Sequence, residues 1–254
     1  MRPPRAAFVA VAAGVALAAC GSGSAGGGGP ARAATASPRA SAPPVVYAAL
    51  GASETAGVGT GDPVREAFPQ QLYQRLGHGT VMYSFGIPGE TTEAALRDEL
   101  PPALAEHPTL ATVWFNVDDM IHGVPVADYE SRLDQVVGGL RQAGVARVLV
   151  ANTPHLDRLP AYFACRPDPP PNAPACLVGA MPLPPPDQLD AQVQAYNAAI
   201  ARVVQAHGAT LVDLYAAGEV PDQHPDYVSD DGFHPSAKGA AAIAATFAAA
   251  LSSP

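Results

Sequence analysis

From Val45 onward, short apolar runs alternate with longer segments whose apolar residues recur at helical spacing. Short apolar runs bounded by turn residues are typical of buried strands. The runs expected to form strands are 45–50, 80–85, 110–117, 147–151 and 210–214. Because a helical segment follows each run, the pattern predicts parallel strands joined by crossover helices.

Two of the helical segments carry clear apolar stripes. One stripe covers 129–140 and ends at Gly144, and the other covers 189–204 and ends at Gly208, a residue type typical of helix stops. Further helices are expected at 65–76, at 91–106 with a bend at Pro101 and Pro102, and at 240–251. Helices on both faces of a parallel sheet predict a flavodoxin-like three-layer α/β/α sandwich, with about five strands in the sheet.

The chain has 254 residues, of which 48% are hydrophobic, which is enough to bury one core in a domain spanning 45–254. Its formal net charge is −9 and only 14 residues are Lys or Arg. This balance excludes the extensive basic surface typical of nucleic-acid-binding proteins. We therefore expect no nucleic-acid partner. Separately, we expect the domain to be a monomer.

The first residues have the pattern of an export signal. Two arginines precede an apolar run at 6–19, which is too short to span a membrane and is typical of a signal peptide over 1–20. The run ends in LAAC at 17–20, which resembles the lipobox of bacterial lipoproteins. That resemblance implies a diacylated Cys20 and a protein lipid-anchored to the outer side of a bacterial cell membrane. The alternative is ordinary signal cleavage, with Cys20 incidental.

Residues 21–44 consist almost entirely of Gly, Ser, Ala, Pro and Arg. Such a segment buries too little apolar surface to offset its ordering entropy, so we expect a disordered tether. Two further cysteines, Cys165 and Cys176, lie in a Pro-rich excursion at 159–186. In an exported protein, a structural disulfide between them is expected.

Candidate functional residues follow the ends of the expected strands. Ser53, Gly86 and Asp118 each lie just past a strand end, where the working residues of parallel sheets gather. Near the C-terminus, Asp231 precedes His234 by three residues on a loop. A carboxylate that orients an imidazole forms a general base, which needs a nucleophile from elsewhere in the chain.

Four sequence blocks, in this order, carry a resemblance to a known family. They are GASET at 51–55, FGIPGETT at 85–92, NVDD at 116–119 and DGFH at 231–234. Over about residues 45–252 the chain resembles the SGNH hydrolases, also called GDSL esterases and lipases. The resemblance implies that Ser53 is the nucleophile, His234 its general base and Asp231 the residue that orients His234.

The chain departs from the family pattern at the oxyanion hole. The resemblance implies backbone donors from Ser53 and Gly86, but Asp118 occupies the place of the family's Asn side chain. An ionised carboxylate accepts hydrogen bonds and would repel the oxyanion. Either Asp118 is held protonated and donates, or Asn116 substitutes from the same face of an extended strand, or the hole works with two donors.

By this resemblance the protein is a serine esterase that cleaves small-molecule or glycan esters through an acyl-enzyme on Ser53, without a cofactor or metal. An acyltransferase would use the same intermediate. Because of Asp118, the rival hypothesis is a non-catalytic lipoprotein that binds an envelope ligand. A third is a surface protein whose excursion at 159–186 binds a partner.

A metal site formed by Asp118, Asp119 and His122 is a further alternative, which lacks additional ligands in the sequence. The remaining histidines are interpreted as ordinary surface or loop residues, and they are His78, His107, His155, His207 and His224.

Overall fold

The computed structural model describes residues 44–176, 183–217 and 223–252, and their strands form one five-stranded sheet in the order β2-β1-β3-β4-β5. Every neighbouring pair of strands is parallel. The strands are β1 (Val46–Gly51), β2 (Val81–Ser84), β3 (Leu110–Trp114), β4 (Arg147–Ala151) and β5 (Thr210–Val212). This is the flavodoxin-like strand order, so the expected fold class is confirmed.

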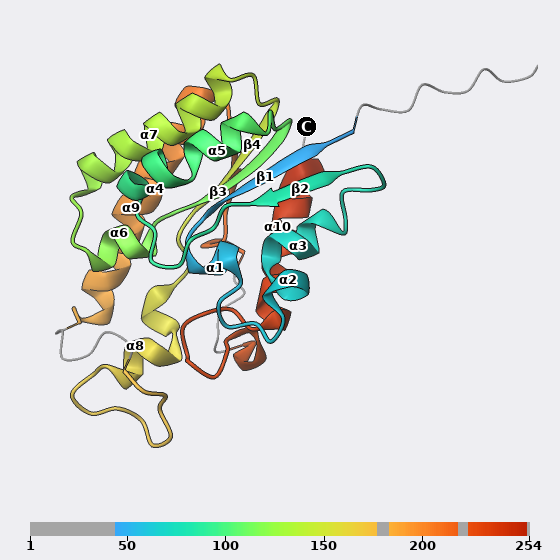
Figure 1. Cartoon of the computed structure of the whole chain (residues 1–254). Coiled ribbons are helices and arrows are strands. Elements are labelled where there is room, and N and C mark those ends of the chain that lie inside the picture. The colour runs from blue at the N-terminus through green and yellow to red at the C-terminus, as the bar shows by residue number, and fades with distance from the viewer. Residues whose placement is uncertain (1–43, 177–182, 218–222, 253–254) are drawn as a thin grey trace, which may run out of the picture. The chain divides into compact units, whose positions relative to one another are not determined.

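Helices cover both faces of the sheet because side chains alternate along each buried strand. In β1, Ala48 and Leu50 pack in one core cluster, whereas Tyr47 and Ala49 pack in the other. The first face is covered by α4 (Thr92–Asp98), α5 (Leu100–Ala105), α7 (Val126–Gln142) and α9 (Pro186–His207). The opposite face is covered by α3 (Phe68–Tyr73) and α10 (Ala237–Ser252), as Figure 1 shows.

Two expected helices are divided in the structure. The segment at 91–106 breaks at Glu99, between α4 and α5, so Pro101 lies in the first turn of α5, where proline is tolerated. The segment at 65–76 breaks at Ala67, whose ψ of 148° is not helical. A short helix α2 (Pro63–Glu66) precedes that break, and α3 follows it.

The expected strand at 110–117 is shorter than the sequence predicts. Hydrogen bonding in β3 ends at Trp114, and α6 (Val117–Ile121) begins three residues later. Between them Asn116 has φ −169° and ψ −52°, which turns the chain out of the sheet. The apolar run at 110–117 therefore spans a strand end and a helix start, which its composition does not distinguish.

Short elements collect after the strands, where the sequence analysis placed the site. Helix α1 (Ser53–Ala56) follows β1. The elements η1 (Leu156–Arg158) and α8 (Pro160–Ala164) follow β4, and η2 (Pro225–Tyr227) follows β5. A disulfide joins Cys165 and Cys176. The expected signal peptide, the tether up to residue 43 and Cys20 lie outside the described residues. Within the described ranges, no helix has the length and apolar character needed to cross a membrane.

Candidate active site

Ser53 is the first residue of α1, directly after β1. Because β1 lies inside the sheet between β2 and β3, its carboxyl end places Ser53 at an interior position of the sheet edge, next to the central strand β3. The side chain is largely buried, and its Oγ donates a hydrogen bond to Oε2 of Glu54 at 3.2 Å. In this state the Ser53 hydroxyl donates to Glu54 rather than to the imidazole of His234.

His234 and Asp231 form a tightly bonded pair on the loop before α10. Nδ1 of His234 lies 2.6 Å from Oδ2 of Asp231, while Oδ1 accepts hydrogen bonds from the Ser229 hydroxyl and the backbone N–H groups of Phe233 and His234. Burial opposes ionisation of Asp231, but these hydrogen bonds prevail and lower its pKa to about 2. The carboxylate is therefore charged at neutral pH and fixes the imidazole with Nδ1 engaged.

Two glycines allow this loop to be closely packed. Gly59 has φ +91°, and a Cβ there would lie 2.7 Å from Cβ of His234. Gly232 has φ +76°, and a Cβ there would lie 2.6 Å from Cγ of Pro174 in the excursion. The Gly232 carbonyl also accepts a hydrogen bond from the Ala161 N–H at 2.9 Å, which ties the histidine loop to the excursion.

A cavity of about 740 Å³ brings the separate candidates together, since Ser53, Asp118 and His234 all line it. Its other walls are mostly apolar and come from α6, from η1 and α8, and from the start of α9. The apolar lining includes Val117, Met120, Ile121, Leu156, Leu159, Ala161, Tyr162, Pro184 and Leu189. A serine and a histidine–aspartate pair thus share one apolar pocket.

Gly86 lies beside the helix that carries Ser53. A Cβ on Gly86 would come within 2.7 Å of Cβ of Thr55 and 2.8 Å of the Ala56 nitrogen, so only glycine fits this contact. The residues on either side of Gly86 donate their N–H groups to β1, to the carbonyls of Ala49 and Gly51. Because ladder hydrogen bonds alternate along a parallel strand, the Gly86 N–H points away from β1.

Asp118 and Asn116 differ in their relation to the cavity. Asp118 lies in the first turn of α6 and lines the cavity, whereas Asn116 is buried outside the cavity lining. The expectation that Asn116 shares a face with Asp118 on an extended strand is wrong, because the strand ends at Trp114. Burial, followed by the nearby Glu54 carboxylate, raises the pKa of Asp118 to about 6.

The alternative metal site at Asp118, Asp119 and His122 is not assembled. Asp119 is fully buried and accepts hydrogen bonds from the Thr92 backbone N–H at 3.0 Å and the Thr92 hydroxyl at 2.7 Å. Nδ1 of His122 lies 2.7 Å from the Asp118 carbonyl oxygen. Asp119 thus anchors the start of α4, and among the described residues these three do not form a group that could hold an ion.

Glu99, which no sequence pattern indicated, supports the strand end beneath Ser53. Glu99 is fully buried, and its Oε2 accepts the Gly51 N–H at 2.9 Å. Burial raises the pKa of Glu99 to about 9, so the group is neutral near pH 7. Gly51 lies two residues before Ser53, but nothing in the local sequence around Glu99 indicates this contact.

Comparison with known proteins agrees with the architecture. The model of the GDSL-like lipase/acylhydrolase family matches residues 49–242. Among solved structures, TesA is 20% identical with a TM-score of 0.60, and the alignment covers 82% of this chain and 98% of TesA. The lipase/acylhydrolase from Enterococcus faecalis is also 20% identical, with a TM-score of 0.60 and coverage of 82% and 95%.

The esterase EstA from Pseudoalteromonas sp. is 17% identical, with a TM-score of 0.58 and coverage of 82% of this chain and 96% of EstA. At these identities the structures share the fold, while none of the curated proteins is significantly similar in sequence. The family assignment rests on the sequence match, which extends from β1 into α10. This chain belongs to the GDSL-like lipase/acylhydrolase family.

Proposed function

We propose that this protein hydrolyses carboxylic esters through an acyl-enzyme on Ser53, with His234 as general base and Asp231 as the residue that orients His234. The observation that carries the proposal is the shared cavity. It is lined by a serine from the start of α1 and by a histidine whose Nδ1 is fixed by a carboxylate, from segments about 180 residues apart in sequence. Family membership supports hydrolase chemistry at this edge of the sheet.

In the proposed reaction, the Ser53 hydroxyl leaves Glu54 and gives its proton to His234 while Oγ bonds to the ester carbonyl carbon. Collapse of the tetrahedral intermediate breaks the carbon–oxygen bond to the alcohol, which departs with the proton from His234. Water then attacks the acyl-enzyme, giving a proton to His234, and the acid leaves as Ser53 recovers its proton. Backbone N–H groups of Ser53 and Gly86 are the proposed donors to the oxyanion.

The cavity favours esters with an apolar acyl chain. Its volume of about 740 Å³ exceeds the needs of an acetyl group, and its walls are mostly aliphatic or aromatic. Burial of each additional methylene group contributes about 0.8 kcal/mol. The excursion contributes Ala161, Tyr162 and Pro184 to these walls, which supports a role in substrate selection rather than in binding a separate partner.

Hydrolysis of p-nitrophenyl esters from acetate to decanoate tests the proposal. We expect kcat/KM to rise from acetate to a medium chain, and Ser53→Ala to abolish turnover of every ester. Ser131→Ala, which removes an exposed hydroxyl on α7, is the matched control and should retain full activity. Turnover by Ser53→Ala equal to that of the wild type would contradict the assigned nucleophile.

A second candidate is a non-catalytic member of the family that binds an envelope ligand in the same cavity. Two observations favour it: Asp118 lines the cavity together with Ser53, and the Ser53 hydroxyl donates its hydrogen bond to Glu54. An activated serine reacts with a fluorophosphonate probe, whereas a serine without a working base does not. Absence of labelling together with retained binding of a fatty acid would select this candidate.

We further propose that the protein is exported and anchored through acylated Cys20, because residues 1–20 have the signal-peptide and lipobox pattern. Incorporation of a labelled fatty acid into the full chain in a bacterial host, and its loss in Cys20→Ala, would support anchoring. Release of unlabelled wild-type protein into the medium would show ordinary signal cleavage instead.

A further inference from the structure

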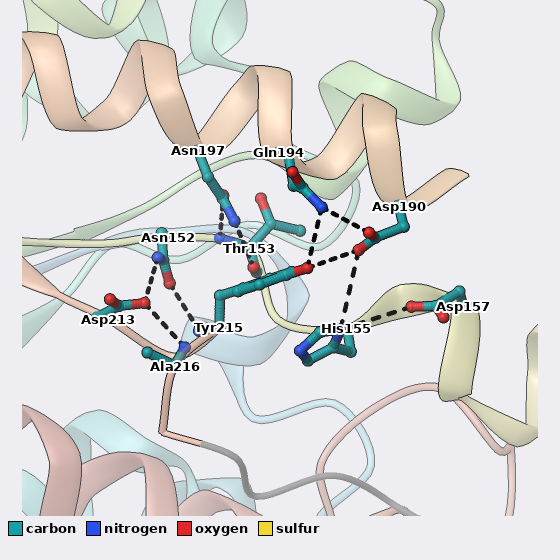
Figure 2. A network of polar contacts seen from close by, with 10 residues as sticks. All are labelled: Asn152, Thr153, His155, Asp157, Asp190, Gln194, Asn197, Asp213, Tyr215 and Ala216. Carbon is teal, nitrogen blue, oxygen red and sulfur yellow. Dashed lines mark hydrogen bonds and ion pairs between the residues drawn. The ribbon is translucent and has the colours of Figure 1, made fainter. Parts of the chain in front are cut away.

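Three potential ligand groups meet at the base of the excursion, outside the Ser53 cavity. Nδ1 of His155 lies 3.8 Å from Oδ1 of Asp157 and 3.9 Å from Oδ1 of Asp190 (Figure 2). The ligand atoms of all three residues lie within 4.8 Å of one another. His155 and Asp157 come from the segment after β4, whereas Asp190 comes from the first turns of α9.

The spacing of these atoms is too wide for direct hydrogen bonds, which require about 2.7–3.2 Å between N and O. It is close to the spacing of ligand atoms around one metal ion. Donors that bind zinc at about 2.0–2.2 Å in tetrahedral geometry lie about 3–4 Å from each other. The separations of the three ligand atoms, which reach at most 4.8 Å, are therefore compatible with one ion of this size bound between them.

Asp157 supplies an independent indication of a missing partner. Its Oδ1, the atom that faces His155, is buried and has no hydrogen-bond partner among the described residues. Buried carboxylate oxygens ordinarily have a donor or a cation as partner. Within the described ranges, neither Asp157 nor Asp190 forms an ion pair with a lysine or arginine, so two acidic groups share one imidazole.

A second layer of contacts holds the ligand groups in place. The Tyr215 hydroxyl donates to Oδ1 of Asp190 at 2.8 Å, and Nε2 of Gln194 donates to Oδ2 at 2.6 Å. The Tyr215 ring packs on the His155 ring, with centroids 3.9 Å apart. Figure 2 shows the two hydrogen bonds from Tyr215 and Gln194 to Asp190. Outer hydrogen bonds of this kind orient the ligands of protein metal sites.

We propose that His155, Asp157 and Asp190 bind one divalent metal ion, with Zn²⁺ the best match, as a structural clamp at the base of the excursion. One imidazole nitrogen and two carboxylate oxygens suit zinc, whereas Ca²⁺ and Mg²⁺ prefer ligand sets made only of oxygen. The ligands alternate with residues of the substrate cavity, since Leu156 and Leu189 line that cavity. The clamp would therefore hold the cavity wall, and it does not depend on the chemistry proposed for Ser53.

The competing account is a metal-free cluster, in which the imidazole and the hydrogen bonds from Tyr215 and Gln194 hold the two carboxylates without an ion. Zinc binding separates the two accounts. The protein, exported or refolded with its disulfide intact, is treated with a chelator, dialysed and titrated with Zn²⁺ by calorimetry, with Mg²⁺ as the comparison ion. Thermal unfolding of the same samples gives a second readout that does not involve activity.

We expect one equivalent of Zn²⁺ to bind and to raise the unfolding temperature, with at least about 10-fold weaker binding of Mg²⁺. Loss of an outer-shell partner alone lowers metal affinity about 10–100-fold, so Asp157→Asn, which removes a ligand, should lower it by about 100-fold or more. The matched control is Asp134→Asn, which removes a carboxylate 2.6 Å from a different histidine, His207, and should bind as the wild type does.

Two outcomes would overturn the proposal. One is the absence of stoichiometric Zn²⁺ binding to the folded wild-type protein, which needs no variant to interpret. The other is wild-type affinity in a folded Asp157→Asn or Asp190→Asn, which would place any bound zinc elsewhere on the chain.

Discussion

The substitution Asp118→Asn tests how the charge on Asp118 affects catalysis. Burial and the Glu54 carboxylate raise the pKa of Asp118 to about 6, so most of the wild-type protein carries an ionised Asp118 above that pH. In the proposed oxyanion hole, an ionised Asp118 opposes the negative charge that develops on the substrate oxygen, whereas an amide can donate a hydrogen bond to it. The variant replaces a repulsive group by a donor.

The expected magnitude follows from the value of one side-chain donor in an oxyanion hole, which is about 10²–10³ in kcat. We expect Asp118→Asn to raise kcat by up to about that factor at pH 8. At pH 5 most Asp118 groups in the wild type are protonated and can donate, so the two proteins should differ by less than about tenfold. The gain should therefore grow as the pH rises through 6.

The same substitution has a predicted effect on stability. A rise in pKa from 3.8 to about 6 corresponds to about 3 kcal/mol against the ionised form, and solvent screening of this partly buried group reduces that to about 1–2 kcal/mol. Because the folded-state pKa is raised, the wild type loses this stability as the pH rises from about 4 to 6. Asp118→Asn should thus be more stable by about 1–2 kcal/mol at pH 8 and nearly equal at pH 4.

The assay is p-nitrophenyl butyrate hydrolysis from pH 5 to 9, with urea unfolding of both proteins at pH 4 and pH 8. A large loss of kcat in Asp118→Asn at every pH would refute the reasoning. It would mean that the carboxyl group itself takes part in the reaction.

Three further predictions concern the support of the site. Glu99→Leu should lower the free energy of unfolding by about 1–3 kcal/mol, because the buried Gly51 N–H loses its acceptor. Glu99→Gln should be destabilised less. It should also lack the loss of stability that the raised pKa of Glu99 predicts for the wild type as the pH increases from about 5 to 9. Gly59→Ala should lower the free energy of unfolding by about 1–3 kcal/mol more than Gly77→Ala does, and it should also lower kcat. Both glycines have positive φ, but only at Gly59 would a new Cβ come close to another group, the Cβ of His234. Reduction of Cys165–Cys176, which closes a loop over a sequence separation of 11, should cost about 2–3 kcal/mol in urea unfolding and weaken the preference for longer acyl chains. Each prediction is contradicted by equal free energies of unfolding: of Glu99→Leu and the wild type, of Gly59→Ala and Gly77→Ala, or of the reduced and the oxidised protein.

The sheet could be predicted because its strands are buried on both faces. The run at 147–151 is short and contains two valines, which favours a strand inside a parallel sheet over a buried helix, and its position in the structure agrees. The boundaries at Glu99 and at Trp114 could not be predicted, because each depends on tertiary contacts. The Glu99 side chain is buried and accepts a hydrogen bond from the Gly51 N–H. Helix α6 starts where the chain leaves the sheet after Trp114.

The candidate site was predictable in part, for a related reason. Ser53, Gly86 and Asp118 follow strand ends, and the geometry of a parallel sheet collects such residues whatever lies between them. His155 was interpreted as an ordinary loop residue because its possible co-ligand Asp190 is 35 positions away, beyond a Pro-rich excursion. Contacts of that range leave no pattern in a single sequence.

The central claim is that Ser53 is an activated nucleophile, and covalent trapping tests it most directly. The domain at 45–254, with its Cys165–Cys176 disulfide intact, is incubated with a fluorophosphonate probe and analysed by intact-mass and peptide mass spectrometry. We predict one adduct per chain located on Ser53, no adduct on Ser53→Ala, and much slower labelling of His234→Ala. A wild-type protein that remains unmodified, or an adduct on another residue, would contradict the account.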